Sequence, residues 1–484
     1  MKIIIRVKQK EFDIEYQEAR MLLGILIDNH LDIPALCGGN GTCKKCKVLI
    51  EDSNSKRVVL ACKTIIKEDT TIILDDYDGK GLIFSKLNDK YKKDYTQGFG
   101  VALDIGTTTL AYYLVDLSNG NIIDSTSKLN PQMVFGADVI SRIKACIEGK
   151  LSELNEAIIS SVNSTLEYFK GKHSIVDIEK LVVSGNTTML HLFNNTDVSS
   201  LGKVPFTPVF LDLKELRGID LKVDAKKVIL MPSFSSFVGA DIVCGAISTN
   251  VLSENSMLID IGTNGEILLN YDNKIYTSST SAGPAFEGSE IECGMGGVSG
   301  AISEIKLINN ELHYKTIDNA PIKGICGSGL FDAVSIMLDK GIINSFGAFE
   351  IDSNKYYISD SVYISQKDIR KFQLAKSAIR SGIDTLIKTS NIDINKIDKI
   401  YIAGGLGYYI SSDSLIRVGL IPKELKDKIE VVGNTSLAGS YLALMSNECI
   451  LDAVKISKRA IDIDLSTSKI FLDKFTDNML FDEE

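Results

Sequence analysis

Four cysteines near the N-terminus are the residues whose type and spacing point most directly to chemistry. Cys37, Cys43 and Cys46 lie in a glycine-rich loop with gaps of five and two residues, and Cys62 follows after fifteen more. Soft thiolates bind zinc or iron-sulfur clusters, and glycines let a loop bend closely around an inorganic core. A zinc ribbon more usually has two CxxC pairs. The spacing therefore favours a 2Fe-2S cluster over zinc and over four unliganded thiols.

Two later segments repeat one another and have the composition of phosphate-binding turns. Residues 101–109 read VALDIGTTT, and residues 258–265 read LIDIGTNG. Each has an aspartate and a glycine turn directly after an apolar strand. Backbone amides and hydroxyls at such a turn can approach phosphate oxygens, and the carboxylate can hold Mg²⁺ through water. One such turn is often a plain hairpin, but two copies favour a nucleotide clamp.

A third segment completes the predicted nucleotide site. Residues 400–407 (IYIAGGLG) form an apolar run that ends in glycines, where an adenine ring could lie against bare backbone. The alternative is a simple turn between a strand and a helix. We expect Asp104 and Asp260 to be the catalytic, magnesium-holding carboxylates. The predicted nucleotide contacts are Gly106, Thr107, Thr108, Thr109, Gly262, Thr263, Asn264, Gly265, Gly404 and Gly405.

The cysteines must be positioned by a small strand-rich unit, which we place at residues 1–78. The spacing of its leucines predicts a helix over residues 19–30. Residues 79–99 are polar and lysine-rich, which is typical of an exposed linker. Apolar or alternating runs predict four strands, at residues 3–7, 12–16, 47–50 and 71–74.

The phosphate turns must be positioned by an α/β fold. From residue 100 onward, β-branched runs alternate with helical stretches. Because the turn that contains Asp104 recurs at Asp260, we expect two similar lobes, at residues 100–255 and 256–484, that face each other across the nucleotide. The motifs of P-loop and Rossmann nucleotide sites are absent where those folds would require them.

Composition excludes several classes of protein. Of the 484 residues, 44% are hydrophobic and 24% are charged, which argues against general disorder. A net charge of −10 argues against a general binder of nucleic acid or of anionic membranes. The N-terminus has no run of signal-peptide length, and every apolar run is far shorter than the ~20 residues of a membrane span. We therefore expect a cytoplasmic protein with no membrane or nucleic-acid partner.

These motifs resemble known families. The cysteine-bearing unit resembles the β-grasp 2Fe-2S ferredoxins, with a first gap similar to the vertebrate type. The three nucleotide segments are similar to the phosphate-1, phosphate-2 and adenosine motifs of the superfamily of sugar kinases, heat-shock chaperones and actin. Four further segments make nearly the whole chain resemble the reductive activators of corrinoid proteins, namely residues 130–143, 184–192, 281–297 and 326–332.

The resemblance implies a fold and an activity. The fold would be a β-grasp 2Fe-2S domain joined to a two-lobed, actin-like ATPase. The enzyme would use Mg²⁺ and ATP to drive an electron from the cluster onto Co(II) of a corrinoid protein in a methyltransferase system, which regenerates Co(I), and a low-potential donor would reload the cluster. Two alternatives remain open: a small-molecule kinase with a fused redox-sensing ferredoxin domain, and a nucleotide-independent electron carrier.

Some expectations are less specific. Better-known members of this family have a further small domain where this chain has only residues 79–99, so a homodimer is compatible with the resemblance but its contacts stay open. Asp138 and Asp241 each follow Gly-Ala and precede an apolar run, which suits either a helix N-cap or a functional carboxylate. The acidic loop 281–297 either reaches the corrinoid or is merely solvated. Lys44 and Lys45 either dock an acidic partner or are ordinary surface lysines.

Overall fold

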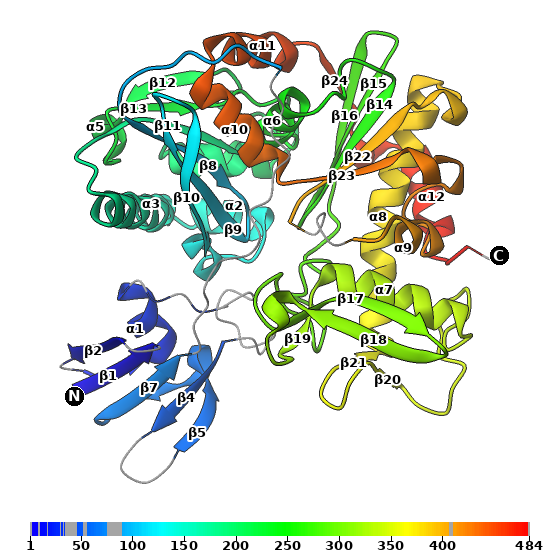
Figure 1. Ribbon diagram of the computed structural model, residues 1–484, viewed down its shortest axis with the longest axis horizontal. Coiled ribbons are helices and arrows are strands. Elements are labelled where there is room, and N and C mark those ends of the chain that lie inside the picture. The colour runs from blue at the N-terminus through cyan, green and yellow to red at the C-terminus, as the bar shows by residue number, and fades with distance from the viewer. Residues whose placement is uncertain are drawn as a thin grey trace.

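The computed structural model describes residues 2–7, 10–16, 18–29, 31, 33, 46–51, 56–74, 90–405 and 410–482. A small N-terminal unit lies beside a larger unit of two lobes (Figure 1). Cys37, Cys43, Lys44, Lys45 and the linker residues 79–89 lie outside the described residues. Within the described parts of the chain, no helix is long and apolar enough to cross a membrane.

The N-terminal unit is a five-stranded sheet with one helix, α1 (Leu22–Asp28), packed against it. The sheet order is β2-β1-β7-β4-β5, and β1 and β7 are parallel neighbours in its centre. This β-grasp topology confirms the predicted fold of the unit. The strands are β1 (Lys2–Val7), β2 (Lys10–Glu15), β3 (Arg20–Met21), β4 (Lys47–Glu51), β5 (Lys56–Leu60), β6 (Ile65–Ile66) and β7 (Thr70–Leu74).

The predicted helix over residues 19–30 is too long. Arg20 and Met21 instead form β3, which pairs with β6, and the N–H of Leu22 donates to the carbonyl of Thr64. The helix therefore begins only where the chain leaves this pairing. Leu22, Leu23 and Leu26, whose spacing predicts the helix, are all buried, and so is Ile25.

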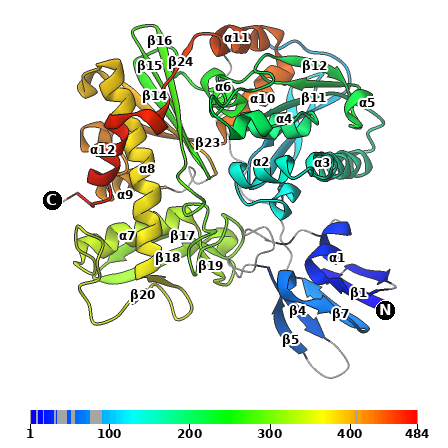
Figure 2. The ribbon, with the colours of Figure 1, turned by 180° about the vertical axis from the view of Figure 1, so that it is seen from behind.

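The first lobe is a six-stranded sheet of order β10-β9-β8-β11-β13-β12. Figure 2 shows α2, α3 and α4 together on one side of it. The strands are β8 (Phe99–Ile105), β9 (Thr109–Asp116), β10 (Asn121–Leu129), β11 (Ile178–Gly185), β12 (Lys214–Arg217) and β13 (Lys227–Leu230). The helices are α2 (Val139–Ile147), α3 (Leu151–His173), α4 (Thr187–Phe193), α5 (Gly218–Leu221) and α6 (Ala240–Ser248).

The second lobe has a sheet of order β23-β22-β14-β15-β16-β24, and it carries a smaller sheet of order β18-β17-β19. The long helix α8 (Gln366–Ser390) contacts both β15 and β16 of the large sheet and β21 beside the small one (Figure 2). The large sheet contains β14 (Ser256–Ile261), β15 (Gly265–Tyr271), β16 (Lys274–Thr280), β22 (Lys399–Ala403), β23 (Ile429–Gly433) and β24 (Ala460–Asp462). The other elements are β17 (Ala301–Ile308), β18 (Glu311–Thr316), β19 (Gly324–Ile325), β20 (Lys355–Tyr357), β21 (Tyr363–Ser365), α7 (Gly327–Asp339), α9 (Ser412–Arg417) and α12 (Lys469–Asp477).

The two large sheets share one plan. Each has an antiparallel meander, β8-β9-β10 or β14-β15-β16, and each adds parallel strands beside its first strand, β11 and β13 or β22 and β23. The repeated turn of the sequence lies at the first hairpin of each meander. The repeat thus reflects two similar sheets.

The chain returns to the first lobe near its C-terminus. Helices α10 (Thr435–Met445) and α11 (Asn447–Ser457) pack against α6, and α10 also contacts β8 and β11. Leu437, Tyr441 and Leu444 join the core of the first lobe. The division at 255/256 stays a prediction, but the core of the first lobe includes residues from beyond it.

Candidate functional site

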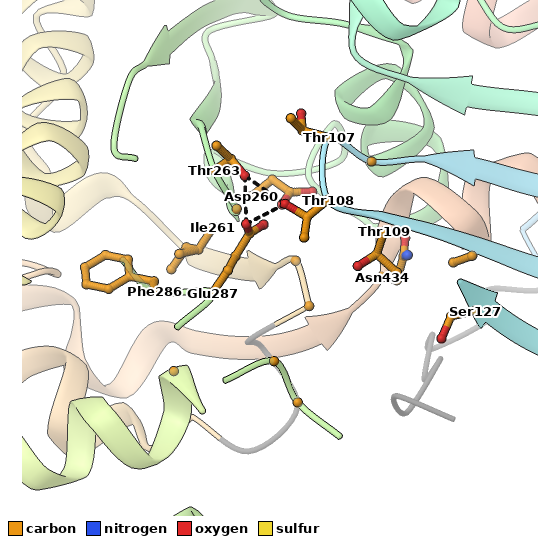
Figure 3. A pocket seen from close by; sticks show the side chains of 18 of the residues that line it. Thr107, Thr108, Thr109, Ser127, Asp260, Ile261, Thr263, Phe286, Glu287 and Asn434 are labelled. Atoms are coloured by element: carbon orange, nitrogen blue, oxygen red, sulfur yellow. Dashed lines mark hydrogen bonds between the residues drawn. The ribbon is translucent and has the colours of Figure 1, made fainter. Parts of the chain in front are cut away.

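The two hairpins that the sequence singles out face one another across a cavity of about 290 Å³ between the lobes (Figure 3). In the first hairpin the N–H of Gly106 donates to the carbonyl of Thr109 over 2.9 Å, and in the second Gly262 donates to Asn264 over 3.0 Å. The predicted site residues that line the cavity are Asp104, Gly106, Thr107, Thr108, Thr109, Asp260, Gly262, Thr263, Asn264, Gly404 and Gly405.

The predicted glycines differ in what they do. Gly404 has a φ of +101°, and a Cβ there would come within 2.8 Å of Asp260 Oδ1, so the backbone must approach the aspartate closely. Gly265 instead begins β15, where a Cβ would come within 2.6 Å of Ile379. Gly265 therefore serves close packing on α8. Residues 406 and 407 of the third segment lie outside the described residues.

Asp104 is held by the first turn of α10. Ser436 Oγ donates to Asp104 Oδ1 over 2.7 Å, and Asn434 Nδ2 donates to Oδ2 over 2.9 Å. Burial raises the pKa of Asp104, and these two hydrogen bonds oppose the rise. Both oxygens of the carboxylate therefore have fixed directions.

Further carboxylates, among them those of Asp241, Asp260 and Glu266, line the same cavity as Asp104. Burial, together with the neighbouring carboxylates, raises the pKa of Asp260 to about 8 and that of Asp241 to about 7. Burial also raises the pKa of Glu266 well above its ordinary value. A cation close to these acids would offset their repulsion.

The two Gly-Ala-Asp segments differ. Asp138 caps α2, because its Oδ1 accepts from the N–H of Ser141 over 2.7 Å. Asp241 is not an N-cap, since Gly239 has that place in α6 and Asp241 lines the cavity from the first turn of the helix. The shared motif therefore gives a structural residue at one site and a cavity residue at the other.

Arg142 and Asn186 support the first hairpin from behind. Arg142 is fully buried, and its guanidinium donates to the carbonyls of Thr107 and Gly136. Burial lowers its pKa to about 9, so it stays a cation at neutral pH. Asn186 Nδ2 donates to Thr107 Oγ1 over 3.1 Å. A buried positive charge directly behind a phosphate turn favours anion binding in front of it.

The acidic loop 281–297 turns toward the protein. Glu287 Oε2 accepts from Thr108 Oγ1 over 2.9 Å and from Thr263 Oγ1 over 2.7 Å (Figure 3). Glu290 forms an ion pair with Lys371, and Glu292 accepts from the hydroxyl of Tyr363. Glu287 is therefore not a merely solvated side chain, whereas Glu290 and Glu292 are exposed and suit that alternative. A corrinoid contact of this loop stays a prediction.

Sequence reasoning missed Asn434, Ser436, Asn186 and Arg142 as parts of the site. Each lies far along the chain from the hairpin residue that it contacts, so no local pattern reveals the pairing. One signal was available, because Asn434 and Ser436 follow a strand, β23, and open a helix, where polar side chains commonly act as caps.

In the N-terminal unit, the two described cysteines of the predicted set lie together. Cys46 and Cys62 are both buried, and their sulfur atoms are 3.2 Å apart. The N–H of Ala61 donates to the carbonyl of Cys46 over 2.8 Å, which fixes one backbone against the other. Two converging buried thiols suit a shared soft metal centre.

The cleft offers a different donor set, which consists of carboxylates and hydroxyls. Among the described residues, no group of three or more His, Cys, Asp or Glu side chains is arranged to hold a metal ion by itself. Mg²⁺ commonly keeps several waters and binds through one or two carboxylates together with substrate phosphates. The residues present fit that mode and do not form an all-protein cage.

Comparisons with known proteins cover the chain from end to end. A family model of the 2Fe-2S iron-sulfur cluster binding domain matches residues 5–67, one of the RACo middle region matches 99–254, and one of the C-terminal ASKHA domain of RACo matches 254–484. A solved structure of a reductive activator for a corrinoid, iron-sulfur protein has a TM-score of 0.77 and 27% identity, over 99% of this chain and 98% of that one. The chain belongs to the family of reductive activators of corrinoid proteins.

Two curated relatives agree with this membership. The corrinoid activation enzyme RamQ of Eubacterium limosum is 28% identical over 99% of both chains. A reductase of the Co(II) methylated amine-specific corrinoid protein from Methanosarcina barkeri is 27% identical, over 77% of this chain and 75% of the relative. The predicted family, the ferredoxin-type domain and the actin-like fold are thereby confirmed.

Proposed function

We propose that this activator couples ATP hydrolysis in the cleft between its lobes to the transfer of one electron onto the Co(II) form of a corrinoid protein in a methyltransferase system. The observation that carries the proposal is that one chain holds both a pair of facing phosphate hairpins around a cavity and a separate unit with converging buried thiols. A nucleotide site alone would not require buried thiols, and an electron-transfer unit alone would not require a nucleotide site. A cytoplasmic setting, in which thiols stay reduced, belongs to the same proposal.

The N-terminal unit supplies the electron. A 2Fe-2S cluster held by Cys37, Cys43, Cys46 and Cys62 would supply single electrons at low potential when bound. The described part of the unit contributes rigidity, because Cys46 and Cys62 are buried and the N–H of Ala61, the neighbour of Cys62, donates to the carbonyl of Cys46. A low-potential donor reloads this unit.

Energy coupling explains why an ATPase is needed. An uphill one-electron step costs about 2.3 kcal/mol per 100 mV, and ordinary coupling between sites supplies only about 1–3 kcal/mol. A deficit of a few hundred millivolts therefore requires a nucleotide-driven rearrangement. In this proposal water accepts the phosphoryl group, so no phosphorylated product forms.

Each part of the cleft has a role in the proposed hydrolysis. The hairpin amides and the hydroxyls of Thr107, Thr108 and Thr263 bind phosphate oxygens, and Gly404 and Gly405 give the adenine ring a flat backbone surface. Asp104 and Asp260 would hold Mg²⁺, which would neutralise charge on the phosphates. Asn434 and Ser436 keep Asp104 oriented for this task.

The N-terminal unit moves between electron donor and acceptor in the proposed cycle. The last part of the predicted linker packs on the first lobe, because Tyr91 is buried and the N–H of Asp94 donates to the carbonyl of Met445. Its remaining residues, 79–89, would reach about 18 Å as a coil. The partners in this proposal are a corrinoid protein and a low-potential donor. A homodimer is compatible with this cycle but is not needed for the transfer.

The test uses the full chain with its cluster reconstituted. It is mixed with a low-potential reductant and a Co(II) corrinoid protein, with and without ATP, and the visible spectrum is followed for Co(I). We expect Co(I) only with ATP. Equal formation of Co(I) without nucleotide would identify an electron carrier, and a stoichiometric phosphorylated small molecule would identify a kinase; either result would refute the proposal.

A further inference from the structure

The carboxylate of Glu287 ties the two phosphate hairpins together. Thr108 Oγ1 of the first lobe and Thr263 Oγ1 of the second lobe both donate to the same oxygen, Oε2, and the two hydroxyl oxygens are themselves 3.4 Å apart (Figure 3). Thr108, Thr263 and Glu287 thus form a three-residue bridge between the lobes, which we name the hydroxyl bridge.

A phosphate group would need the same two donors. A threonine hydroxyl has a single proton to donate. While Thr108 and Thr263 donate to Glu287, neither can donate to a phosphate oxygen. A carboxylate and a terminal phosphate are both anionic. If both contacted the same two hydroxyls they would repel one another, in a cavity that already contains Asp104 and Asp260. The two groups are therefore mutually exclusive occupants of one position.

The backbone at Glu287 is fixed on both sides. Phe286 packs against Phe331 and Phe372 with ring centroids 4.7 and 5.2 Å away. Gly288 has a φ of +78°, and a Cβ there would come within 2.5 Å of the nitrogen of Met295. Since the main chain cannot withdraw easily, the side chain of Glu287 must rotate away to open the bridge.

We propose that Glu287 is a specificity-determining residue whose carboxylate takes the place of the terminal phosphate of a nucleotide until a triphosphate displaces it. The inference rests on the proposed binding of nucleotide in the cleft. A ligand without terminal phosphates leaves the hydroxyl bridge closed. A triphosphate offers oxygens to both hairpins, opens the bridge and so transmits its presence to both lobes.

The experiment measures nucleotide affinity in the full chain with its cluster. A non-hydrolysable ATP analogue and AMP are titrated into the wild type, Glu287→Gln and Glu287→Ala by calorimetry. Both variants remove the competing charge, so each should bind the analogue about tenfold more tightly, while the affinity for AMP should not change. Glu290→Gln, in the same loop but paired with Lys371, should behave as the wild type.

The possible results separate two failures. If Glu287→Gln and Glu287→Ala bind the analogue no more tightly than the wild type, the displacement is overturned while nucleotide binding stands. If neither the wild type nor any variant binds the analogue, the proposed function itself is overturned together with this inference. The absorbance of the cluster and the unfolding temperature confirm that each variant is folded.

Discussion

Asp104 and Asp260 occupy equivalent places in the two hairpins, but their surroundings differ. Asp104 accepts one hydrogen bond at each oxygen, from Asn434 and Ser436. Asp260 lies among other carboxylates, and its pKa rises to about 8. Asp104 is thus held in one orientation, whereas Asp260 is repelled by the neighbouring carboxylates when it is ionised. We expect the two to respond differently to substitution and to pH.

Replacing Asp104 should abolish ATP turnover. In Asp104→Ala the fixed carboxylate is lost, so we expect kcat to fall by about 10²–10³-fold, while the visible spectrum of the cluster stays intact. Asp393→Ala is the matched control, because it removes the cap of the short 3-10 turn Ile394–Lys396, away from the cavity; it should cost up to about 1 kcal/mol of stability but keep turnover. Loss of the cluster spectrum in Asp104→Ala would show that the two units are not separable.

The acids of the cleft make stability depend on pH. With folded pKa values of about 8 for Asp260 and about 7 for Asp241, against an ordinary value of 3.8, the folded chain holds more protons than the unfolded chain between these limits. The free energy of unfolding therefore falls as the pH rises from about 4 to about 8.

Thermal unfolding without Mg²⁺ from pH 5 to 8.5 checks this dependence. Asp260→Asn cannot ionise, so it should lose less stability over the range than the wild type. Mg²⁺ with an ATP analogue should reduce the loss in the wild type. Parallel curves for the wild type and Asp260→Asn would contradict the assignment of the high pKa to Asp260.

Among the residues of the site, the sequence identifies those that recur in a repeated motif. The repeated turn correctly brings Asp104, Thr108, Asp260 and Thr263 to one cavity, although their chemical roles stay predictions. It could not predict Ser436, which lies more than 300 positions from Asp104, because only the fold brings them together. Asp241 has the same local motif as Asp138, so the sequence alone could not separate cavity residue from cap.

Among the elements, α10 is the one that links the lobes. It begins directly after β23 of the second lobe, its first turn holds Asp104, and its length packs on α6 of the first lobe. All eleven of its residues are buried. A helix without a polar face indicates burial between layers, so its sequence could predict that it is enclosed but not which sheet it covers.

The contact between α10 and α6 depends on a glycine. A Cβ at Gly439 would come within 2.5 Å of Cys244 Cα, on the backbone of α6. Gly439→Ala should therefore push the two helices apart and cost about 1–3 kcal/mol, measured as a lower unfolding temperature. Gly171→Ala in α3, where a Cβ would meet nothing within 4 Å, is the matched control and should leave stability unchanged or raise it by up to about 1 kcal/mol. Equal unfolding temperatures for the two variants would show that the helix contact can relax.

In the whole molecule, loss of the cluster in the N-terminal unit should not impair nucleotide binding in the cleft between the lobes. Cys62→Ser removes one of the two converging thiols in the N-terminal unit. We expect it to lower the iron content and abolish electron delivery to the corrinoid protein, while the affinity for an ATP analogue in the cleft stays the same. Iron analysis and calorimetry on one preparation measure both.

Cys449→Ser is the control for that experiment, because this buried thiol lies in α11 and far from the cysteine set in sequence. It should keep the iron content. Weaker nucleotide binding in Cys62→Ser would mean that the state of the N-terminal unit reaches the cleft, against the independence stated above.

The sequence predicts the overall architecture better than the contacts between its elements. The two-part organisation and the paired lobes follow from the cysteine spacing and the repeated turn. The return of the chain to the first lobe does not, because the sequence shows only that α10 is largely apolar and that α11 is amphipathic.

That return bears on how the protein is made. During translation residues 99–248 emerge from the ribosome long before residues 435–457. Yet α10 and α11, which those later residues form, are required to cover α6, β8 and β11. The nascent first lobe must wait, with apolar surface uncovered, until most of the remaining polypeptide has emerged. A transcript that stops before codon 435 would thus yield an aggregation-prone fragment, and chaperones that shield the growing chain would matter more here than for a protein whose lobes close in order of synthesis.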